Sequence, residues 1–178
     1  MDADADPEAV ARAIILRRLT AAPRSRAELA KTLASREVPE PVAGAVLDRF
    51  TEVGLVDDAA YAGMLVRSRR ASRGLARRAL ADELRRRGVS DEVAAEALEE
   101  IQPEDEAAQA RALVQRRLPS TRGADPRSQV RRLVGMLARK GYPSGLALRV
   151  VTEALARESP PDGPDIIEPG AVGPMSEE

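Results

Sequence analysis

The sequence contains no cysteine and no histidine, and this absence removes whole classes of function. Without thiolates or imidazoles the chain cannot form a zinc finger, a disulfide framework, a cysteine nucleophile or a Ser-His-Asp triad. Aromatic residues are scarce too, since the 178 residues include two Tyr, one Phe and no Trp. The core must therefore be built from Ala, Leu and Val, which suit closely packed helices better than a sheet.

Long apolar runs are also missing from the sequence. No run approaches the ~18 residues that a transmembrane helix needs. The N-terminal Met-Asp-Ala-Asp-Ala-Asp lacks the basic start of a signal peptide. We therefore expect a cytoplasmic protein that does not contact membranes.

The formal charge of −1 hides an uneven distribution of charge. Segments 1–9 and 159–178 hold nine of the 29 acids and no base, so all 28 Lys and Arg lie in segment 10–158 with the other 20 acids. That segment carries a net +8. The asymmetry indicates a polyanionic or acidic partner. The alternative is a merely solvated helical surface, with Arg favoured by the composition of the genome.

The apolar spacing is helical along most of the chain, and Pro, Gly and capping residues divide it into nine helices. One of these signals is the capping box that Ser25 and Glu28 can form. The predicted helices cover 7–20, 25–35, 39–53, 57–70, 73–87, 90–102, 104–118, 125–141 and 143–158. The Pro- and Gly-rich segment 159–178 is predicted to be disordered.

Six apolar positions recur in three copies, which indicates a repeated three-helix unit. They are Leu29, Leu33, Val38, Val42, Leu47 and Phe50, then Leu80, Leu84, Val89, Val93, Leu98 and Ile101, then Leu133, Leu137, Tyr142, Leu146, Val151 and Ala154. We predict an all-α fold of three tandem, helix-turn-helix-like repeats, with acidic disordered tails at 1–9 and 159–178. The repeats cover 10–56, 57–102 and 103–158, and they stack into an elongated, curved array.

Enzymatic activity is not expected. Adjacent acids at 57–58, 82–83, 91–92 and 99–100 could in principle exchange protons or hold Mg²⁺. Two of these pairs lie at helix starts, where acids stabilise the helix, and Asp82 can pair with Arg78 and Arg86 one turn away. We therefore predict no enzyme, no metal and no cofactor.

Helix-turn-helix docking in a DNA major groove is disfavoured by charge. In that mode the later helix contacts the DNA, but the helix from Asp91 to Ile101 carries five acids and no base. Positive charge gathers instead in segment 67–87, which has nine Arg against two acids. Helical periodicity places Arg78, Arg85 and Arg86 on its outward face. We call the following set the arginine ridge and predict that it binds the partner: Arg67, Arg69, Arg70, Arg73, Arg77, Arg78, Arg85 and Arg86.

Three segments carry a resemblance to a known family. The stretches Gly54-Leu-Val-Asp-Asp-Ala-Ala-Tyr-Ala62, Arg73-Gly-Leu-Ala-Arg-Arg-Ala-Leu-Ala-Asp-Glu-Leu-Arg-Arg-Arg-Gly-Val89 and Leu133-Val-Gly-Met-Leu-Ala-Arg-Lys-Gly-Tyr142 resemble the RecX family, regulators of the recombinase RecA. Tyr61 replaces an aromatic that is often Phe in the family, and Pro143 departs from the other copies. We interpret Asp57, Asp58, Tyr61, Gly88 and Gly141 as structural residues of this motif.

The resemblance implies a function. Members of the family bind in the groove of the RecA–DNA filament and inhibit its ATPase, strand-exchange and coprotease activities, which restrains recombination, DNA repair and the SOS response. We expect this chain to act as a monomer on that filament, with weak nonspecific contacts to DNA. Two alternatives remain open: a nonspecific DNA-binding protein that acts by occupying DNA, and a helical adaptor for another acidic protein.

Overall fold

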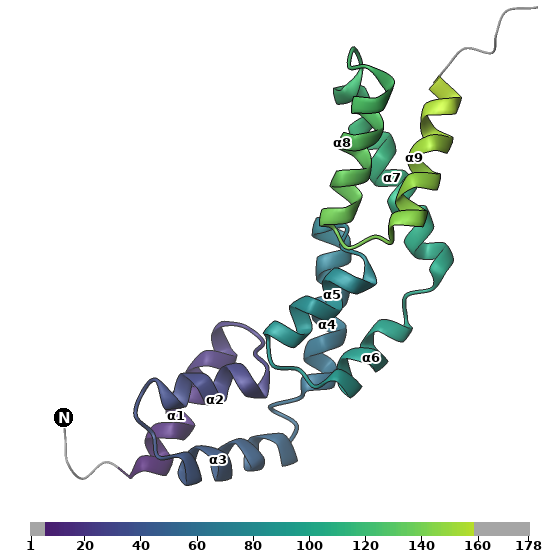
Figure 1. Cartoon of the computed structure of the whole chain (residues 1–178). Coiled ribbons are helices and arrows are strands. Elements are labelled where there is room, and N and C mark those ends of the chain that lie inside the picture. The colour runs from purple at the N-terminus through teal and green to yellow at the C-terminus, as the bar shows by residue number, and fades with distance from the viewer. Residues whose placement is uncertain (1–5, 159–178) are drawn as a thin grey trace, which may run out of the picture.

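The structure, a computed structural model, describes residues 6–158. Over this part of the chain it consists of nine α-helices and one 3₁₀-helix, with no strand (Figure 1). The elements are α1 (Pro7–Ala21), α2 (Arg26–Ala34), α3 (Glu40–Glu52), α4 (Asp58–Arg73), α5 (Arg77–Arg86), α6 (Asp91–Glu99), α7 (Pro103–Arg117), η1 (Leu118–Thr121), α8 (Pro126–Arg139) and α9 (Ser144–Glu158). The predicted disorder of 159–178 and of residues 1–5 lies outside the described residues. The predicted tail 1–9 is too long, because residues 7–9 form the first turn of α1 behind its N-cap Asp6.

The helices form three consecutive bundles, each with its own core, and this confirms the predicted all-α repeat architecture. Helices α1 to α3, α4 to α6 and α7 to α9 pack against one another, and a separate cluster of buried apolar side chains lies inside each bundle. The six apolar positions that recur in the sequence are buried or half-buried in each of the three repeats. The bundles follow one another along an elongated, curved body, so the sequence order of the repeats is also their spatial order (Figure 1).

The start of the fifth helix differs from the prediction. Helix α5 begins at Arg77 rather than near Arg73, and α4 continues to Arg73. Gly74 ends α4 in the left-handed conformation, with φ of 62°, which a glycine adopts without steric cost. Arg73 therefore lies at the end of α4 and not on the face of α5.

The middle helices of the three repeats are stacked end to end. The backbone N–H of Ala76, the N-cap of α5, donates to the carbonyl of Lys140 at the end of α8, over 2.9 Å. At the other end of α5, the hydroxyl of Ser25, the N-cap of α2, donates to the carbonyl of Arg87 over 2.6 Å. Helices α8, α5 and α2 thus form one row in which each C-terminus meets the next N-terminus (Figure 1).

The turn after each middle helix holds a residue with positive φ, and two of these turns require glycine. A Cβ on Gly88 would lie 2.3 Å from Cβ of Ala27, and one on Gly141 would lie 2.6 Å from the backbone N of Ala79. The equivalent residue of the first repeat is Glu37, with φ of 60°. A side chain fits there because Glu37 is exposed, and within residues 6–158 no other repeat packs against that end of the row.

Candidate interaction surface

The joint between the first two repeats is a partly buried polar cluster. Ser25 is fully buried, and its capping box with Glu28 is formed as the sequence predicts. Arg87 reaches across the joint and donates to Glu28 over 2.9 Å and to the Tyr61 hydroxyl over 3.3 Å. Burial alone would raise the pKa of Glu28, but the bonds from the Ser25 N–H and from Arg87 outweigh it and lower this pKa. Arg87 is therefore a structural residue of the joint.

The joint between the second and third repeats uses equivalent positions with different side chains. The N-cap of α5 is Ala76, which has no side-chain acceptor, and the N–H of Arg77 donates instead to Glu106 of the next repeat over 2.8 Å. The Tyr142 hydroxyl donates to the carbonyl of Gly74 over 3.0 Å, and the Lys140 ammonium donates to the carbonyl of Arg73. Burial raises the pKa of Tyr142 to about 12. Glu106 thus has the place that Asp58 has in the first joint, where Asp58 accepts from the backbone N–H of Arg26 at the start of α2.

The acidic turn of the motif performs two tasks. Asp57 caps α4 by accepting from the N–H of Ala60 over 2.9 Å. Asp58 accepts from the backbone N–H of Arg26 over 2.8 Å, which ties α4 to the start of α2. Tyr61 is buried, with 5% of its surface exposed, and it packs in the core of the second repeat. The cap and the packing were visible in the sequence, whereas the contact between Asp58 and Arg26 was not.

The arginine ridge divides into an exposed and an internal part. Among the residues that the structure describes, Arg73, Arg78 and Arg86 are exposed and have no ion-pair partner. Arg67 and Arg85 are also exposed, but each has an acid nearby. This part of the ridge is available for contact with a partner.

The other three arginines of the ridge contact the rest of the fold. Arg69 donates to Glu83 over 2.9 Å, and both side chains are largely buried. Arg70 is half-buried beside α7. Arg77 is exposed, but its guanidinium is bonded to the carbonyl of Ile101 over 3.0 Å. Helical periodicity does not show which neighbouring helix covers or binds a side chain, as α5 does with Arg69.

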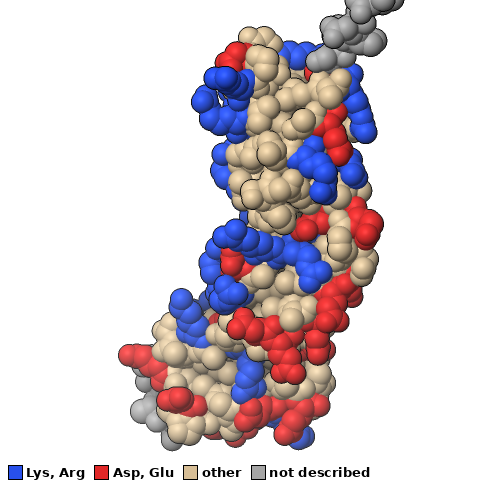
Figure 2. Space-filling model, turned by 45° about the vertical axis from the view of Figure 1, so that its right-hand side comes forward, with Lys and Arg blue, Asp and Glu red and all other residues tan. Residues whose placement is uncertain are grey.

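Acidic and basic side chains gather on different parts of the array. Figure 2 shows Lys and Arg mainly over the upper and middle parts of the body, including its left-hand side, whereas most Asp and Glu lie in the lower half, above all at the lower right. All acids of α6 are exposed: Asp91, Glu92, Glu96 and Glu99. This placement agrees with the expectation that α6 repels phosphates.

The adjacent acids do not form a metal centre in the part of the chain that the structure describes. No group of three or more potential ligands comes together within residues 6–158. The pairing predicted for Asp82 is corrected, because its partner is Arg85 at 3.2 Å and not Arg78 or Arg86. Asp91 and Glu92 lie in the first turn of α6, as predicted from the dipole of that helix.

Two basic hollows outside the ridge were missed in the sequence. One lies between α1 and α2 and is lined by Arg17, Arg18 and Arg36, and the other lies against α8. The aligned repeats contain a signal for them, since Glu83 of the second repeat corresponds to the uncharged Thr32 and Met136 of the other two.

Within residues 6–158, no helix combines the length and the apolar composition that a transmembrane segment needs.

Fold and surface together define a class: a tandem array of three-helix repeats that offers long, charged helical faces for contact with a macromolecule. Three family models match it in the same order. These are the first three-helix domain of RecX over residues 11–50, the second over 57–98 and the third over 104–151. The chain belongs to the RecX family.

Relatives and solved structures agree with this assignment. The chain is 57% identical to a protein of Thermobifida fusca named regulatory protein RecX, over 86% of this chain and 83% of the relative. A protein of the same name from Streptomyces coelicolor is 54% identical over 86% of this chain and 81% of its own. The crystal structure of RecX from Lactobacillus salivarius superimposes with a TM-score of 0.77 at 18% identity, covering 85% and 98% of the two chains. That likeness concerns the fold.

Proposed function

We propose that this chain is a negative regulator of recombination and the SOS response that binds the RecA–DNA filament and inhibits its ATPase, strand-exchange and coprotease activities. The family supports this role, because the relatives carry the name regulatory protein RecX. In this proposal the protein acts by binding and performs no reaction itself. The elongated, curved body suits a filament, since an array of repeats makes a long contact with a modest area on each repeat.

The exposed part of the arginine ridge carries the contact. Arg78 and Arg86 project from α5 in the central repeat without an acid to neutralise them among residues 6–158. Guanidinium groups in this state bind carboxylates or phosphates through paired hydrogen bonds. Arg69 and Arg70 are half-buried members of the ridge, and the exposed Arg77 is bonded to the carbonyl of Ile101.

Charge reversal of the ridge tests the proposal. A variant with Arg78→Glu, Arg85→Glu and Arg86→Glu should keep its helical circular dichroism. The concentration that half-inhibits DNA-dependent ATP hydrolysis by RecA should rise about tenfold or more, since several paired contacts are lost. Arg78→Gln with Arg86→Gln leaves Arg85 and its two acids in place and should weaken inhibition in the same direction. The matched control reverses Arg127, Arg149 and Arg157, which are exposed on α8 and α9.

Each outcome decides between functions. Equal inhibition by the ridge variant and the control would remove the ridge from the mechanism. Binding to naked single-stranded DNA as tightly as to the filament, at roughly 0.15 M salt, would favour a protein that acts by occupying DNA. No preference for the filament and no DNA binding would favour an adaptor for another acidic protein.

A further inference from the structure

An arginine occupies the same place in all three repeats, at the end of the first helix and facing the middle helix. These are Arg18, Arg69 and Arg117, each three residues after a buried apolar residue of its helix. The facing positions on the middle helices are Thr32, Glu83 and Met136, each directly before a buried leucine. Only the second repeat thus has an acid opposite the arginine.

In the second repeat the arginine is neutralised within the protein. Glu83 Oε1 lies 2.9 Å from Arg69 Nε and 3.5 Å from a terminal nitrogen of Arg87. Glu83 has only 9% of its surface exposed. The space between the first and middle helices is therefore filled by an ion-pair network.

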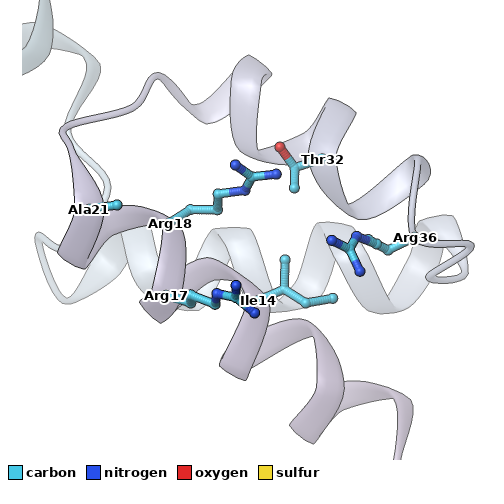
Figure 3. A pocket seen from close by; sticks show the side chains of 6 residues that line it. All are labelled: Ile14, Arg17, Arg18, Ala21, Thr32 and Arg36. Atoms are coloured by element: carbon cyan, nitrogen blue, oxygen red, sulfur yellow. The ribbon is translucent and has the colours of Figure 1, made fainter.

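In the first repeat the same place is an open basic hollow. Arg17, Arg18 and Ile14 of α1 line it together with Thr32 of α2 and Arg36 of the turn after α2. Figure 3 shows the Arg18 guanidinium extending toward Thr32, with Arg17 and Arg36 on either side of Ile14. Within the described chain these three arginines have no ion-pair partner.

The hollow of the first repeat continues toward the joint. Arg24, Lys31 and Arg86 line this extension. Its one acid is Glu28, which accepts from the Ser25 N–H and from Arg87 and lies 3.9 Å from Arg24, whereas Lys31 and Arg86 have no ion-pair partner within residues 6–158. The positive charge of the hollow therefore remains largely uncompensated.

The third repeat has an equivalent hollow between η1 and α8. Arg117, Arg131, Arg132 and Arg139 line it, beside the hydroxyl-bearing Ser120 and Thr121. No acid is among its lining residues, and these four arginines have no ion-pair partner within residues 6–158. Like charges held around one concave surface raise the local positive potential, which a bound anion relieves.

We infer that the two outer hollows bind the phosphate backbone of a nucleic acid strand. They lie beside α2 and α8, the two ends of the row of middle helices. A ligand that occupies both must carry anionic groups along its length, as a sugar-phosphate backbone does. None of the residues named above is aromatic, so the contact takes no support from base stacking and is independent of base sequence. This inference goes beyond the proposed function, since it needs no recombinase.

The second repeat supplies the design of the test. Thr32→Glu and Met136→Glu each place a carboxylate opposite the arginine, as Glu83 does in the second repeat, and Thr32→Gln and Met136→Gln are their neutral controls. The probe is a fluorescently labelled oligothymidylate, and its affinity is measured by anisotropy at several salt concentrations. Each Glu variant should bind about tenfold more weakly than its Gln control and should show a shallower salt dependence, because phosphate contacts are lost.

A second set of variants removes the arginines themselves. Replacing Arg17, Arg18 and Arg36 by Gln, or Arg131, Arg132 and Arg139, should weaken oligothymidylate binding about tenfold per hollow. Replacing Arg127, Arg149 and Arg157 by Gln removes the same charge outside the hollows and should change affinity less than about twofold. Equal loss in the hollow and control variants would overturn the inference.

Two further measurements separate nucleic acid binding by the hollows from binding of an acidic protein and from RecA inhibition by the ridge. If polyglutamate of matched charge displaces the oligonucleotide equally well, the occupant is an acidic protein and the inference is wrong. DNA binding is judged only on the variants of Arg17, Arg18, Arg36, Arg131, Arg132 and Arg139 and of Thr32 and Met136, in which Arg86, the one residue shared by the ridge and the first hollow, is unchanged. RecA inhibition is judged on the ridge variants, so failure of either test leaves the other result standing. Circular dichroism of every variant reports its folding.

Discussion

The Ser25 hydroxyl donates a 2.6 Å hydrogen bond to the carbonyl of Arg87, 62 residues further along the chain. The same hydroxyl accepts from the N–H of Glu28, so one fully buried oxygen both caps α2 and receives the end of α5. The repeats are thus joined through their helix ends, where the free backbone groups of one helix satisfy those of the next. Three predictions concern these joints.

Gly88→Ala should open or strain the first joint. The new methyl would lie 2.3 Å from Cβ of Ala27 and would also occupy a φ of 74°. We expect the free energy of unfolding to fall by about 2 to 4 kcal/mol, the sum of the left-handed strain and the overpacking. Chemical denaturation followed by circular dichroism measures this loss.

Gly54→Ala is the matched control for that substitution. Gly54 has nearly the same φ, 72°, and nothing lies within 4 Å of its added Cβ. This variant should lose only the left-handed strain, about 1 to 2 kcal/mol. Equal losses at both glycines would show that the close approach to Ala27 contributes nothing. A Gly88→Ala chain that stays stable but becomes straighter in small-angle scattering would show that the first two repeats change their relative angle at the joint instead of losing stability.

Glu28→Gln should remove an acid-sensitive part of the stability. The pKa of Glu28 is lowered in the folded chain, so its contribution is complete above the ordinary value of 4.5 and is lost as the pH falls through the lower, folded pKa. At pH 7 the variant should be less stable by about 1 to 2 kcal/mol, because a charge-assisted bond to Arg87 is weakened. The difference from the unmodified chain should shrink when denaturation is repeated toward pH 3.

Glu8→Gln provides the comparison for a surface pair. Glu8 lies 2.6 Å from Arg12, and both side chains are at least half exposed. Exposed pairs of this kind contribute little, so we expect a loss below about 0.5 kcal/mol at pH 7. A pH-independent difference for Glu28→Gln would contradict the assignment of the ionised Glu28 to the joint.

Tyr142 should ionise unusually late. With Tyr61→Phe in a chain that lacks Trp, Tyr142 becomes the single source of tyrosinate absorbance. Burial raises its pKa to about 12, so the absorbance should rise near that pH rather than near 10. Because the folded pKa is raised, the stability that Tyr142 contributes is complete below pH 10 and is lost as the pH rises toward 12. A midpoint near 10 would mean that the ring is solvated and the bond to Gly74 is absent.

Most of the fold could be predicted because it depends on local patterns. The spacing of residues such as Leu29, Leu80 and Leu133 records which side of each helix is buried, and Ser25 and Asp57 are capping residues that mark helix starts. The predicted start of α5 was wrong because Gly74 was read within a helix, although a glycine in the left-handed conformation ends α4. The N-cap of α5 also bonds to another repeat, from Ala76 N–H to the carbonyl of Lys140, and this contact joins residues too far apart for local periodicity to reveal.

The candidate site was only partly accessible for the same reason. The exposure of Arg78 follows from helical geometry on one segment, but the neutralisation of Arg69 by Glu83 requires the packing of α4 against α5. The hollows depend on two helices from one repeat and so are not a property of either segment alone. Comparing Thr32 with Glu83 across the repeats would have indicated the hollows. The carboxylate of Glu83 fills the space between the first and middle helices by pairing with Arg69, and Thr32 has no such group.

Glu37 and Pro126 determine how many units the stack can contain. Docking another repeat onto α2 would require a glycine at Glu37, since Gly88 and Gly141 admit their neighbours only by having no Cβ. At the opposite end, Pro126 is the first residue of α8 and has no backbone N–H, whereas Arg26 and Arg77 at the same place in α2 and α5 donate theirs to an acid of the next repeat. The joint therefore cannot be copied at either terminus. The row of middle helices thus has a fixed length and cannot polymerise through its own joints. The repeat from which it is built could otherwise continue indefinitely.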